Sequence, residues 1–172
     1  MEAEPVQFLW RRYEELLNPS RDELARFIGA NARDLVFVTN ATTAINSVVR
    51  SLRLGPGDEV LTTNHDYNAC RNVLAEATHR TGAKLVVANI PFPIAGEEEA
   101  VEAVLSAVTK RTRLAMIDHV TSNTALVLPL EKIVKELQSR GVETLVDGAH
   151  ATGMIPLNLN TLGATYYTGN LH

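Results

Sequence analysis

The sequence has very little cysteine and no long apolar run, and each lack excludes a class of protein. A single cysteine, Cys70, rules out an internal disulfide and is typical of a reducing, cytoplasmic setting. No apolar stretch approaches the roughly 20 residues that a membrane-spanning helix needs. The first five residues, Met-Glu-Ala-Glu-Pro, are acidic and no apolar segment follows them, so no secretory signal is visible. We therefore expect a cytoplasmic location and no membrane partner.

The chain also lacks an excess of positive charge and most of the familiar catalytic motifs. Its 16 lysine and arginine residues face 20 aspartate and glutamate residues, for a net charge of -4, so nucleic acid is not an expected partner. The G-x-G-x-x-G motif, the Walker phosphate loop, the G-x-S-x-G nucleophile elbow and the H-E-x-x-H and C-x-x-C spacings do not occur. These absences count against ordinary nucleotide enzymes and serine hydrolases, and we expect no metal site.

What the sequence does contain is an alternation of short apolar strands and amphipathic helices. Its 172 residues are 45% hydrophobic and 21% charged, which suits one globular α/β unit. Apolar strands separated by helices predict a three-layer αβα fold with a mostly parallel mixed sheet. The expected strands are 35–38, 59–62, 84–88, 113–117, 143–146 and 164–167, and the expected helices between them are 43–52, 68–80, 97–108 and 130–140.

Two further helices are expected before this alternation. Residues 3–17 carry apolar side chains near helical period, and Asn18-Pro19 should break that helix. Ser20 and Glu23 have the spacing of a capping box, which predicts a second helix that ends near Gly29. We expect residues 1–30 to form a helical segment that packs on the core, and residues 31–172 to form the α/β domain.

Polar residues follow directly after several of the expected strands. In parallel sheets ligands bind outside the carboxyl ends of the strands, so these residues are the candidates for a site. Asn40, Ala41, Thr42 and Thr43 lead into a helix, whose free N–H groups suit a phosphate. The alternative is that Asn40 or Thr42 only caps the helix. Asp147 follows an apolar strand and needs a partner, which would be a protonated pyridine nitrogen, a salt bridge or the N–H groups of the next turn.

Four of the five histidines also lie after expected strands. His65 could stack on a flat ring or only satisfy a backbone carbonyl, and Tyr67 is near enough in sequence to compete for stacking. His150 shares the strand end of Asp147, where a lone histidine is more often a packed structural residue. His119 follows Asp118 directly, so the two side chains should point in opposite directions.

Taken together, five segments resemble the class V aminotransferase family of fold-type I pyridoxal-phosphate enzymes. The resemblance is strongest to its isopenicillin N epimerase-like branch, with cysteine desulfurases as relatives. Each segment is weak alone, but all five occur in the order that the family has. They are 39–46 (TNATTAIN), 65–68, 122–129, 147–153 (DGAHATG) and 166–172 (YYTGNLH).

The resemblance implies pyridoxal 5'-phosphate as cofactor and three catalytic residues. Asp147 would pair with the ring nitrogen and keep it protonated, His65 would stack on the ring, and His150 would face the phenolic oxygen. Further cofactor contacts are implied at the phosphate, at the ring face with Tyr67 as second choice, at the phenolic oxygen with Asn123, and before the Schiff-base lysine. In sequence order these further residues are Ala41, Thr42, Thr43, Tyr67, Asn123, Thr168, Asn170 and His172.

In the family the residue after the one matching His172 is the Schiff-base lysine. The resemblance therefore implies that residues 31–172 are the cofactor-binding large domain of a longer protein, truncated before that lysine and without the small C-terminal domain. The implied function is conversion of a small amino-acid-like substrate through an external aldimine and a Cα carbanion, epimerase- or aminotransferase-like, in a homodimer. The fragment alone should be inactive.

Other functions stay open at this point. One alternative within the family is a cysteine desulfurase or C–S lyase. From another class, the chain could be a non-catalytic ligand-binding relative of the fold. A Rossmann-like domain that binds some other phosphorylated ligand is the third, and it gives Asp147 no reason to approach an aromatic ring.

Overall fold

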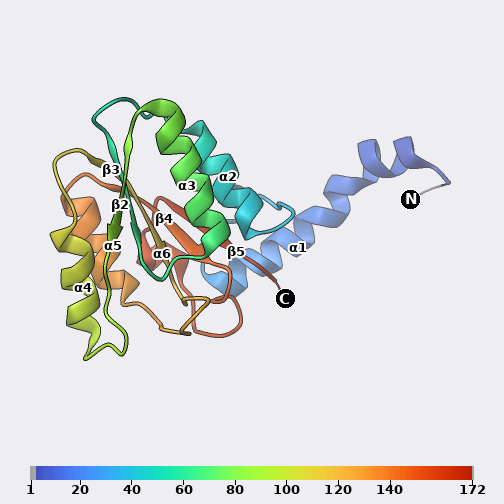
Figure 1. Ribbon diagram of the computed structural model, residues 1–172. Helices are drawn as coiled ribbons and strands as arrows, with labels where there is room; N and C mark the ends of the chain where they lie inside the picture. Colours follow the sequence, from blue (N-terminus) through green and yellow to red (C-terminus); the bar gives the residue numbers. More distant parts are fainter. Residues whose placement is uncertain (1–2, 172) are drawn as a thin grey trace.

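Five of the six apolar segments predicted as strands do form strands. Each of the five has at least one neighbouring strand with which its backbone forms hydrogen bonds. The computed structural model describes residues 3–171, and its sheet has the order β2-β1-β3-β4-β5 with all four pairings parallel (Figure 1). The predicted αβα layers are thus confirmed. The strands are β1 Glu59–Thr63, β2 Lys84–Ala88, β3 Thr112–Asp118, β4 Glu143–Gly148 and β5 Tyr166–Gly169.

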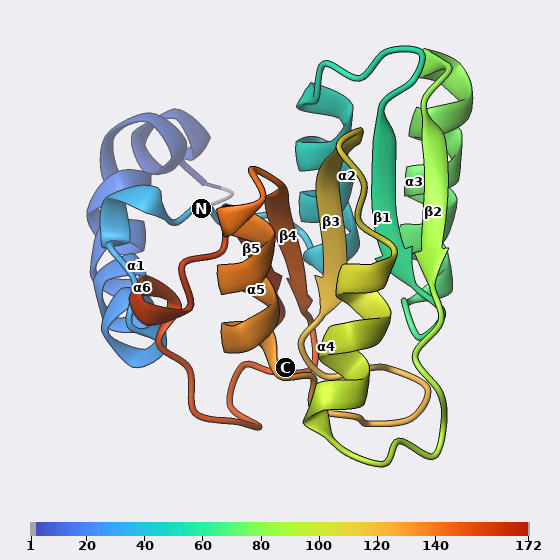
Figure 2. The same ribbon diagram turned by 90° about the vertical axis from the view of Figure 1, so that its left-hand side faces the viewer.

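The helices cover both faces of the sheet, as nearly continuous apolar strands require. Figure 2 shows α2 (Ala41–Ser51) and α3 (Asn68–Thr81) on one side, and α4 (Glu97–Ser106) and α5 (Leu130–Ser139) on the other. Alternation along β3 feeds both cores, since Leu114 and Met116 pack in the α2–α3 layer and Ala115 and Ile117 in the α4–α5 layer. These two packed layers make the sheet rigid enough to hold side chains at its ends in fixed positions.

The predicted strand at residues 35–38 is wrong. This segment follows a short 3-10 helix, η2 (Ala32–Asp34), and runs extended without a paired strand among the described residues. Val36 is 80% exposed, so its apolar character does not place it in the core. Apolar content alone was not enough, because a strand also needs a neighbour to accept and donate its backbone hydrogen bonds. A further short helix, α6 (Leu159–Leu162), was not predicted.

The predicted break at Asn18-Pro19 and the capping role of Ser20 are also wrong. A π-helical turn, η1 (Gln7–Arg12), leads into α1 (Tyr13–Ile28), which continues through Pro19. Proline removes a single N–H donor, so the hydrogen bonds of the neighbouring turns can carry a helix across it. Only the end of α1 packs, where Ala25 and Ile28 are buried, while Trp10 is 86% exposed. The start of this helical segment projects away from the body (Figure 1).

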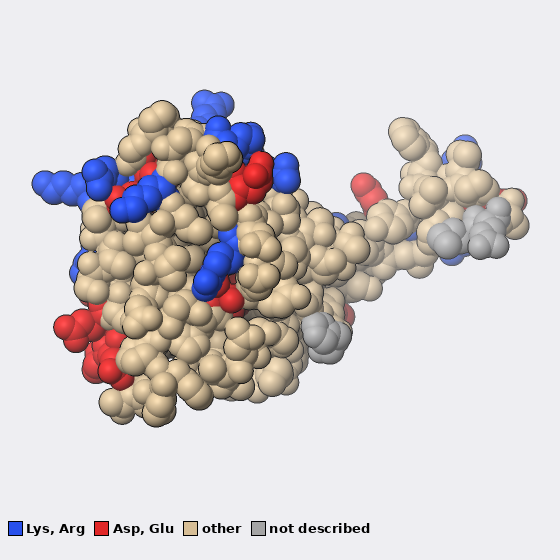
Figure 3. Space-filling view, viewed as in Figure 1, with Lys and Arg blue, Asp and Glu red and all other residues tan. Residues whose placement is uncertain are grey.

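The surface carries charges of both signs. On the face drawn in Figure 3, basic side chains gather mostly along the upper edge, near the loop between α2 and β1 in Figure 1. Within residues 3–171, no helix is both long and apolar enough to cross a membrane.

Two strands extend beyond their apolar runs into polar residues. β3 ends on Asp118 and β4 continues through Asp147 to Gly148. Because the strands are parallel and paired in register, these ends lie side by side at one edge of the sheet. The fold therefore places two acidic residues next to each other, at the edge where parallel sheets bind ligands.

Candidate functional site

A cavity of about 330 Å³ opens at the carboxyl ends of β3 and β4, beside the start of α2. Its size is at the lower end of the usual range for small-molecule sites, which is roughly 300–1,000 Å³. Six of the residues singled out from the sequence line it: Ala41, Thr42, Tyr67, Asp147, His150 and Asn170. Asn40, Asp118, Val120, Ser122 and Ala149 complete the lining. Segments more than 100 residues apart in sequence thus meet around one space.

The first turn of α2 forms one wall of the cavity. Asn40 caps the helix, because its Oδ1 accepts hydrogen bonds from Thr43 N at 2.8 Å and Thr43 Oγ1 at 3.0 Å. Both polar groups of Thr43 are thereby used, and Thr43 does not line the cavity. Asn170 Oδ1 accepts from Ala41 N at 3.0 Å, which ties the helix start to the end of the chain. Thr42 faces the cavity at the positive end of the helix dipole, which favours an anion.

Asp147 lies opposite, with 4% of its surface exposed. Its Oδ1 accepts from Ala149 N at 3.0 Å and its Oδ2 accepts from Cys70 Sγ at 3.4 Å. Burial, followed by the nearby Asp147 carboxylate, raises the pKa of the Cys70 thiol, so Cys70 remains a neutral donor. None of the ion pairs among residues 3–171 involves Asp147. Among these residues, Asp147 therefore has no salt-bridge partner, but its carboxylate does accept a hydrogen bond from an N–H group of the following turn.

Asp118 is the site residue whose role the sequence left open. It pairs in register with Asp147 across β3 and β4, and only 2% of it is exposed. Its Oδ1 is buried and has no hydrogen-bond partner among the described residues. Burial, with the carboxylates of Asp147 and Asp66 adding to it, raises the pKa of Asp118 to about 8. The sequence did contain a signal for Asp118 as a site residue, because it directly follows an apolar segment predicted as a strand, as Asp147 does.

His65, which was expected to stack on the ring, is not among the residues that line the cavity. Its Nε2 donates to the Ile90 carbonyl oxygen at 2.9 Å, and its Nδ1 is 3.2 Å from Thr124 Oγ1. These contacts hold the buried ring against the loops that follow β2 and β3, and the bond to Ile90 is the backbone-carbonyl alternative. Tyr67, 46% exposed, lines the cavity instead.

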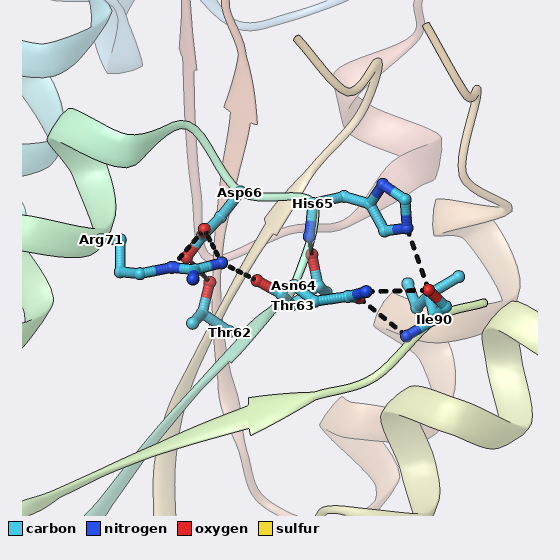
Figure 4. A network of polar contacts seen from close by, with 7 residues as sticks. All are labelled: Thr62, Thr63, Asn64, His65, Asp66, Arg71 and Ile90. Carbon is cyan, nitrogen blue, oxygen red and sulfur yellow. Dashed lines mark hydrogen bonds and ion pairs between the residues drawn. The ribbon is translucent and has the colours of Figure 1, made fainter. Parts of the chain in front are cut away.

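The loop that carries His65 and Tyr67 is fixed by a network of polar contacts (Figure 4). Asn64 exchanges two hydrogen bonds with the Ile90 backbone, at 3.0 and 2.8 Å. Asp66 accepts from Thr62 Oγ1 at 2.8 Å and from Arg71 Nε at 2.7 Å, which ties the loop back to β1 and forward to α3. The network uses side chains on both sides of Tyr67, so Tyr67 reaches the cavity from a rigid loop.

Two other predicted residues, Thr168 and Asn123, do not line the cavity. Thr168 pairs with Asp147 across β4 and β5, but its Oγ1 is directed to the Val146 carbonyl at 3.4 Å and it lines a neighbouring groove. Asn123 is exposed and does not line the cavity, whereas its neighbour Ser122 does. His172 lies outside the described residues. Among those residues, no group of three or more His, Cys, Asp or Glu side chains is placed to hold a metal ion.

His119 points away from Asp118, as the sequence predicted for neighbours on a strand. Its Nδ1 is 3.0 Å from the Tyr167 hydroxyl and the two rings meet edge to face. Burial lowers the pKa of His119, which favours the neutral ring. The Tyr167 ring lies against Gly148, the residue between Asp147 and Ala149.

Replacing Gly148 by alanine should destabilise the protein by about 1–3 kcal/mol, the usual result of forcing an extra methyl group into a packed core. A methyl group there would overlap the Tyr167 ring, which must move and lose its contact with His119. The urea midpoint of the full-length protein measures the change. Gly55→Ala is the matched control, because a methyl group at Gly55 meets nothing within 4 Å. Equal midpoints for the two variants would contradict the packing argument.

Comparisons with known proteins point to one family. The sequence model of the aminotransferase class-V family matches residues 7–170. The chain is 37% identical to isopenicillin N epimerase of Streptomyces clavuligerus over 170 residues, covering 99% of this chain and 43% of the relative. It is 30% identical to L-cysteine desulfhydrase of Arabidopsis thaliana, covering 98% of this chain and 40% of the relative.

A solved structure gives the same picture of the fold. A mutant of C-DES, in which glycine is covalently linked to the PLP cofactor, superimposes with a TM-score of 0.86 at 26% identity. The superposition covers 92% of this chain and 42% of C-DES. The chain therefore spans about two fifths of the length of the proteins that it resembles.

Proposed function

This chain belongs to the aminotransferase class-V family, and we propose that it is the cofactor-holding part of a pyridoxal-phosphate enzyme. The enzyme would convert a small amino-acid-like substrate at its Cα, in the manner of an epimerase or aminotransferase. Support comes from the isopenicillin N epimerase relative and from the PLP cofactor of the C-DES mutant. We also propose that the whole protein acts as a homodimer in the cytoplasm.

One observation carries this proposal: the cavity joins a threonine-bearing helix start to a buried carboxylate that has no basic partner among the described residues. The residues present fit the cofactor. The start of α2 suits its phosphate, Tyr67 offers a flat face for its ring, and Asp147 suits a protonated ring nitrogen. When bound, pyridoxal phosphate acts as an electron sink for the bonds at the Cα of an amino acid.

The residues of this chain would share the work as follows. Thr42 and the first turn of α2 bind the phosphate, with Asn170 holding that turn in place. Asp147 holds a proton on the ring nitrogen, and its own orientation is fixed by Ala149 N and Cys70 Sγ. Tyr67 takes the stacking position first assigned to His65. His150 and Ser122 line the same cavity and are the candidates to face the phenolic oxygen.

A second candidate reaction is carbon–sulfur cleavage, which the L-cysteine desulfhydrase relative favours. If the reaction is that of a cysteine desulfurase, in which a reactive cysteine attacks the sulfur of the substrate, Cys70 does not suit that role. It is fully buried, it donates to Asp147, and its thiol pKa is raised. A nucleophilic cysteine, if the reaction uses one, must come from another part of the protein.

The absorption spectrum of the full-length protein tests the proposal. Added pyridoxal phosphate should give a visible band that differs from that of the free cofactor and that borohydride removes. A protein that remains colourless with added cofactor would support the non-catalytic ligand-binding alternative instead.

Replacing Tyr67 by alanine should weaken cofactor binding about tenfold, while Tyr67→Phe should bind nearly as the wild type does. A stacked aromatic pair contributes about 0.5–1.5 kcal/mol beyond its buried area, and 1.4 kcal/mol is a factor of ten. A fluorescence titration of the cofactor-free protein with pyridoxal phosphate measures the affinity. Tyr13→Ala is the control, since Tyr13 has similar exposure but lies on α1, away from the cavity. Unchanged affinity in Tyr67→Ala would remove the stacking role.

A further inference from the structure

Two carboxyl groups end neighbouring strands at the cavity, and only one of them has been given a role. Asp118 on β3 and Asp147 on β4 are partners in the strand register, both are almost completely buried, and both line the cavity. Two negative charges this close in a poorly hydrated place repel each other strongly. The pair is therefore expected to hold a proton at a pH where isolated carboxyl groups are ionised.

The hydrogen bonds decide which member holds that proton. Asp147 accepts from the Ala149 N–H and from the Cys70 S–H, and both donors stabilise a carboxylate. Asp118 Oδ1 has no partner within the described part of the chain although it is buried. The neutral form of Asp118 avoids an uncompensated buried charge, so the proton belongs on Asp118.

Among residues 3–171, none of the ion pairs involves Asp118. Tyr67 and His150 line the same cavity. From β4 Asp118 faces the Asp147 carboxylate, and from the loop after β1 it faces Asp66. Asp66 is itself bound to Arg71, whose charge is thereby engaged. Cys70 on α3 is neutral, and His119, next in the chain, contacts Tyr167 instead. The raised pKa of Asp118 agrees with this arrangement.

We propose that Asp118 is a positioning residue that holds the single proton of the Asp118–Asp147 pair in the cofactor-free protein and releases it when the ring nitrogen of the cofactor binds beside Asp147. The inference rests on the proposed function, because it takes the ring nitrogen to lie against Asp147. The O–H bond of Asp118 breaks, and no electrons are exchanged with the ligand. The proton passes to a ring nitrogen that enters unprotonated, or to solvent when the ring nitrogen is already protonated.

The first half of the proposal can be tested without any cofactor. Infrared difference spectra of the cofactor-free full-length protein, recorded as the pH is raised, should contain a carboxylic-acid C=O band that is lost around pH 8. The band should be missing in Asp118→Asn. A wild-type protein without such a band, or a band that persists in Asp118→Asn, would overturn the proposal. The wild-type titration alone suffices if the variant does not fold.

The second half is tested by counting protons on binding. Calorimetric titrations with pyridoxal phosphate near pH 7, in two buffers of different ionisation enthalpy, should give up to one more proton released by the wild type than by Asp118→Asn. Glu143→Gln, a change at the exposed opposite end of β4, should match the wild type. Equal counts in the wild type and Asp118→Asn would overturn the release step. A wild type that binds no cofactor would remove the proposed function and this step together, while the infrared result would still stand.

Discussion

Replacing Asp147 by asparagine in the full-length protein is expected to lower the rate of Cα chemistry by about 10²–10³-fold while the cofactor still binds. Asparagine keeps the shape of the side chain and an oxygen that can accept from Ala149 N, so the local structure should survive. It lacks the negative charge that holds a proton on the ring nitrogen. Losing one such electrostatic contact in a water-poor site typically costs this much in rate.

The measurement is the exchange of a Cα proton of glycine for deuterium in D₂O, together with the absorption spectrum of the bound cofactor. Glu143→Gln serves again as control, since it removes one carboxylate from the other end of the same strand. A near-normal exchange rate in Asp147→Asn would take Asp147 out of the mechanism. A spectrum that shows no bound cofactor would assign Asp147 to binding rather than to catalysis.

Raising the pH from 6 to 9 should destabilise the cofactor-free wild type by about 3 kcal/mol, and Asp118→Asn should lose most of this dependence. The pKa of Asp118 is about 8 in the folded protein, well above the ordinary value of 3.8. Between these two values the folded state holds a proton that the unfolded state has lost. Stability therefore falls as the pH rises through this window, and it levels off above about pH 8.

Urea unfolding of the full-length wild type and of Asp118→Asn at several pH values measures this dependence. Asp58→Asn is a suitable control, because Asp58 is a partly exposed residue at the opposite end of the sheet, paired with Arg113. Parallel pH curves for the wild type and Asp118→Asn would show that Asp118 is ionised in the folded state at neutral pH, and this would contradict the proton assignment.

Much of the fold could be predicted from the sequence because apolar strands with helices between them have few stable arrangements. The strand expected at residues 84–88 has the same bounds as β2, and the others differ from their strands by one or two residues at one end or at both ends. The strand predicted at residues 35–38 was wrong because apolar side chains do not show whether a segment has a neighbouring strand to pair with. The helix break predicted at Pro19 was wrong because the loss of one backbone N–H donor does not by itself end a helix.

The place of the site was predictable for a similar reason, while the direction of single side chains was not. Parallel strands bring their carboxyl ends to one edge, and this is enough to place Asp118 beside Asp147. Thr42 lines the same cavity although the segment before α2 is not a strand. His65 is hydrogen-bonded to Ile90, a residue 25 positions later that no local pattern connects to it. Asp118 could have been recognised, since each of the two expected strands 113–117 and 143–146 is directly followed by an aspartate, and parallel neighbours place such residues side by side.

The contact between the Ala41 N–H and Asn170 spans 129 positions of the chain, and this has a consequence for the order of assembly. A polypeptide leaves the ribosome N-terminus first, so α2 emerges long before the residue that fastens its first turn. Until β5 joins the edge of the sheet, the first turn of α2 lacks this hydrogen bond. If this turn binds the cofactor phosphate as proposed, the cofactor should be captured only after residue 170 has been synthesised and β5 has joined the sheet.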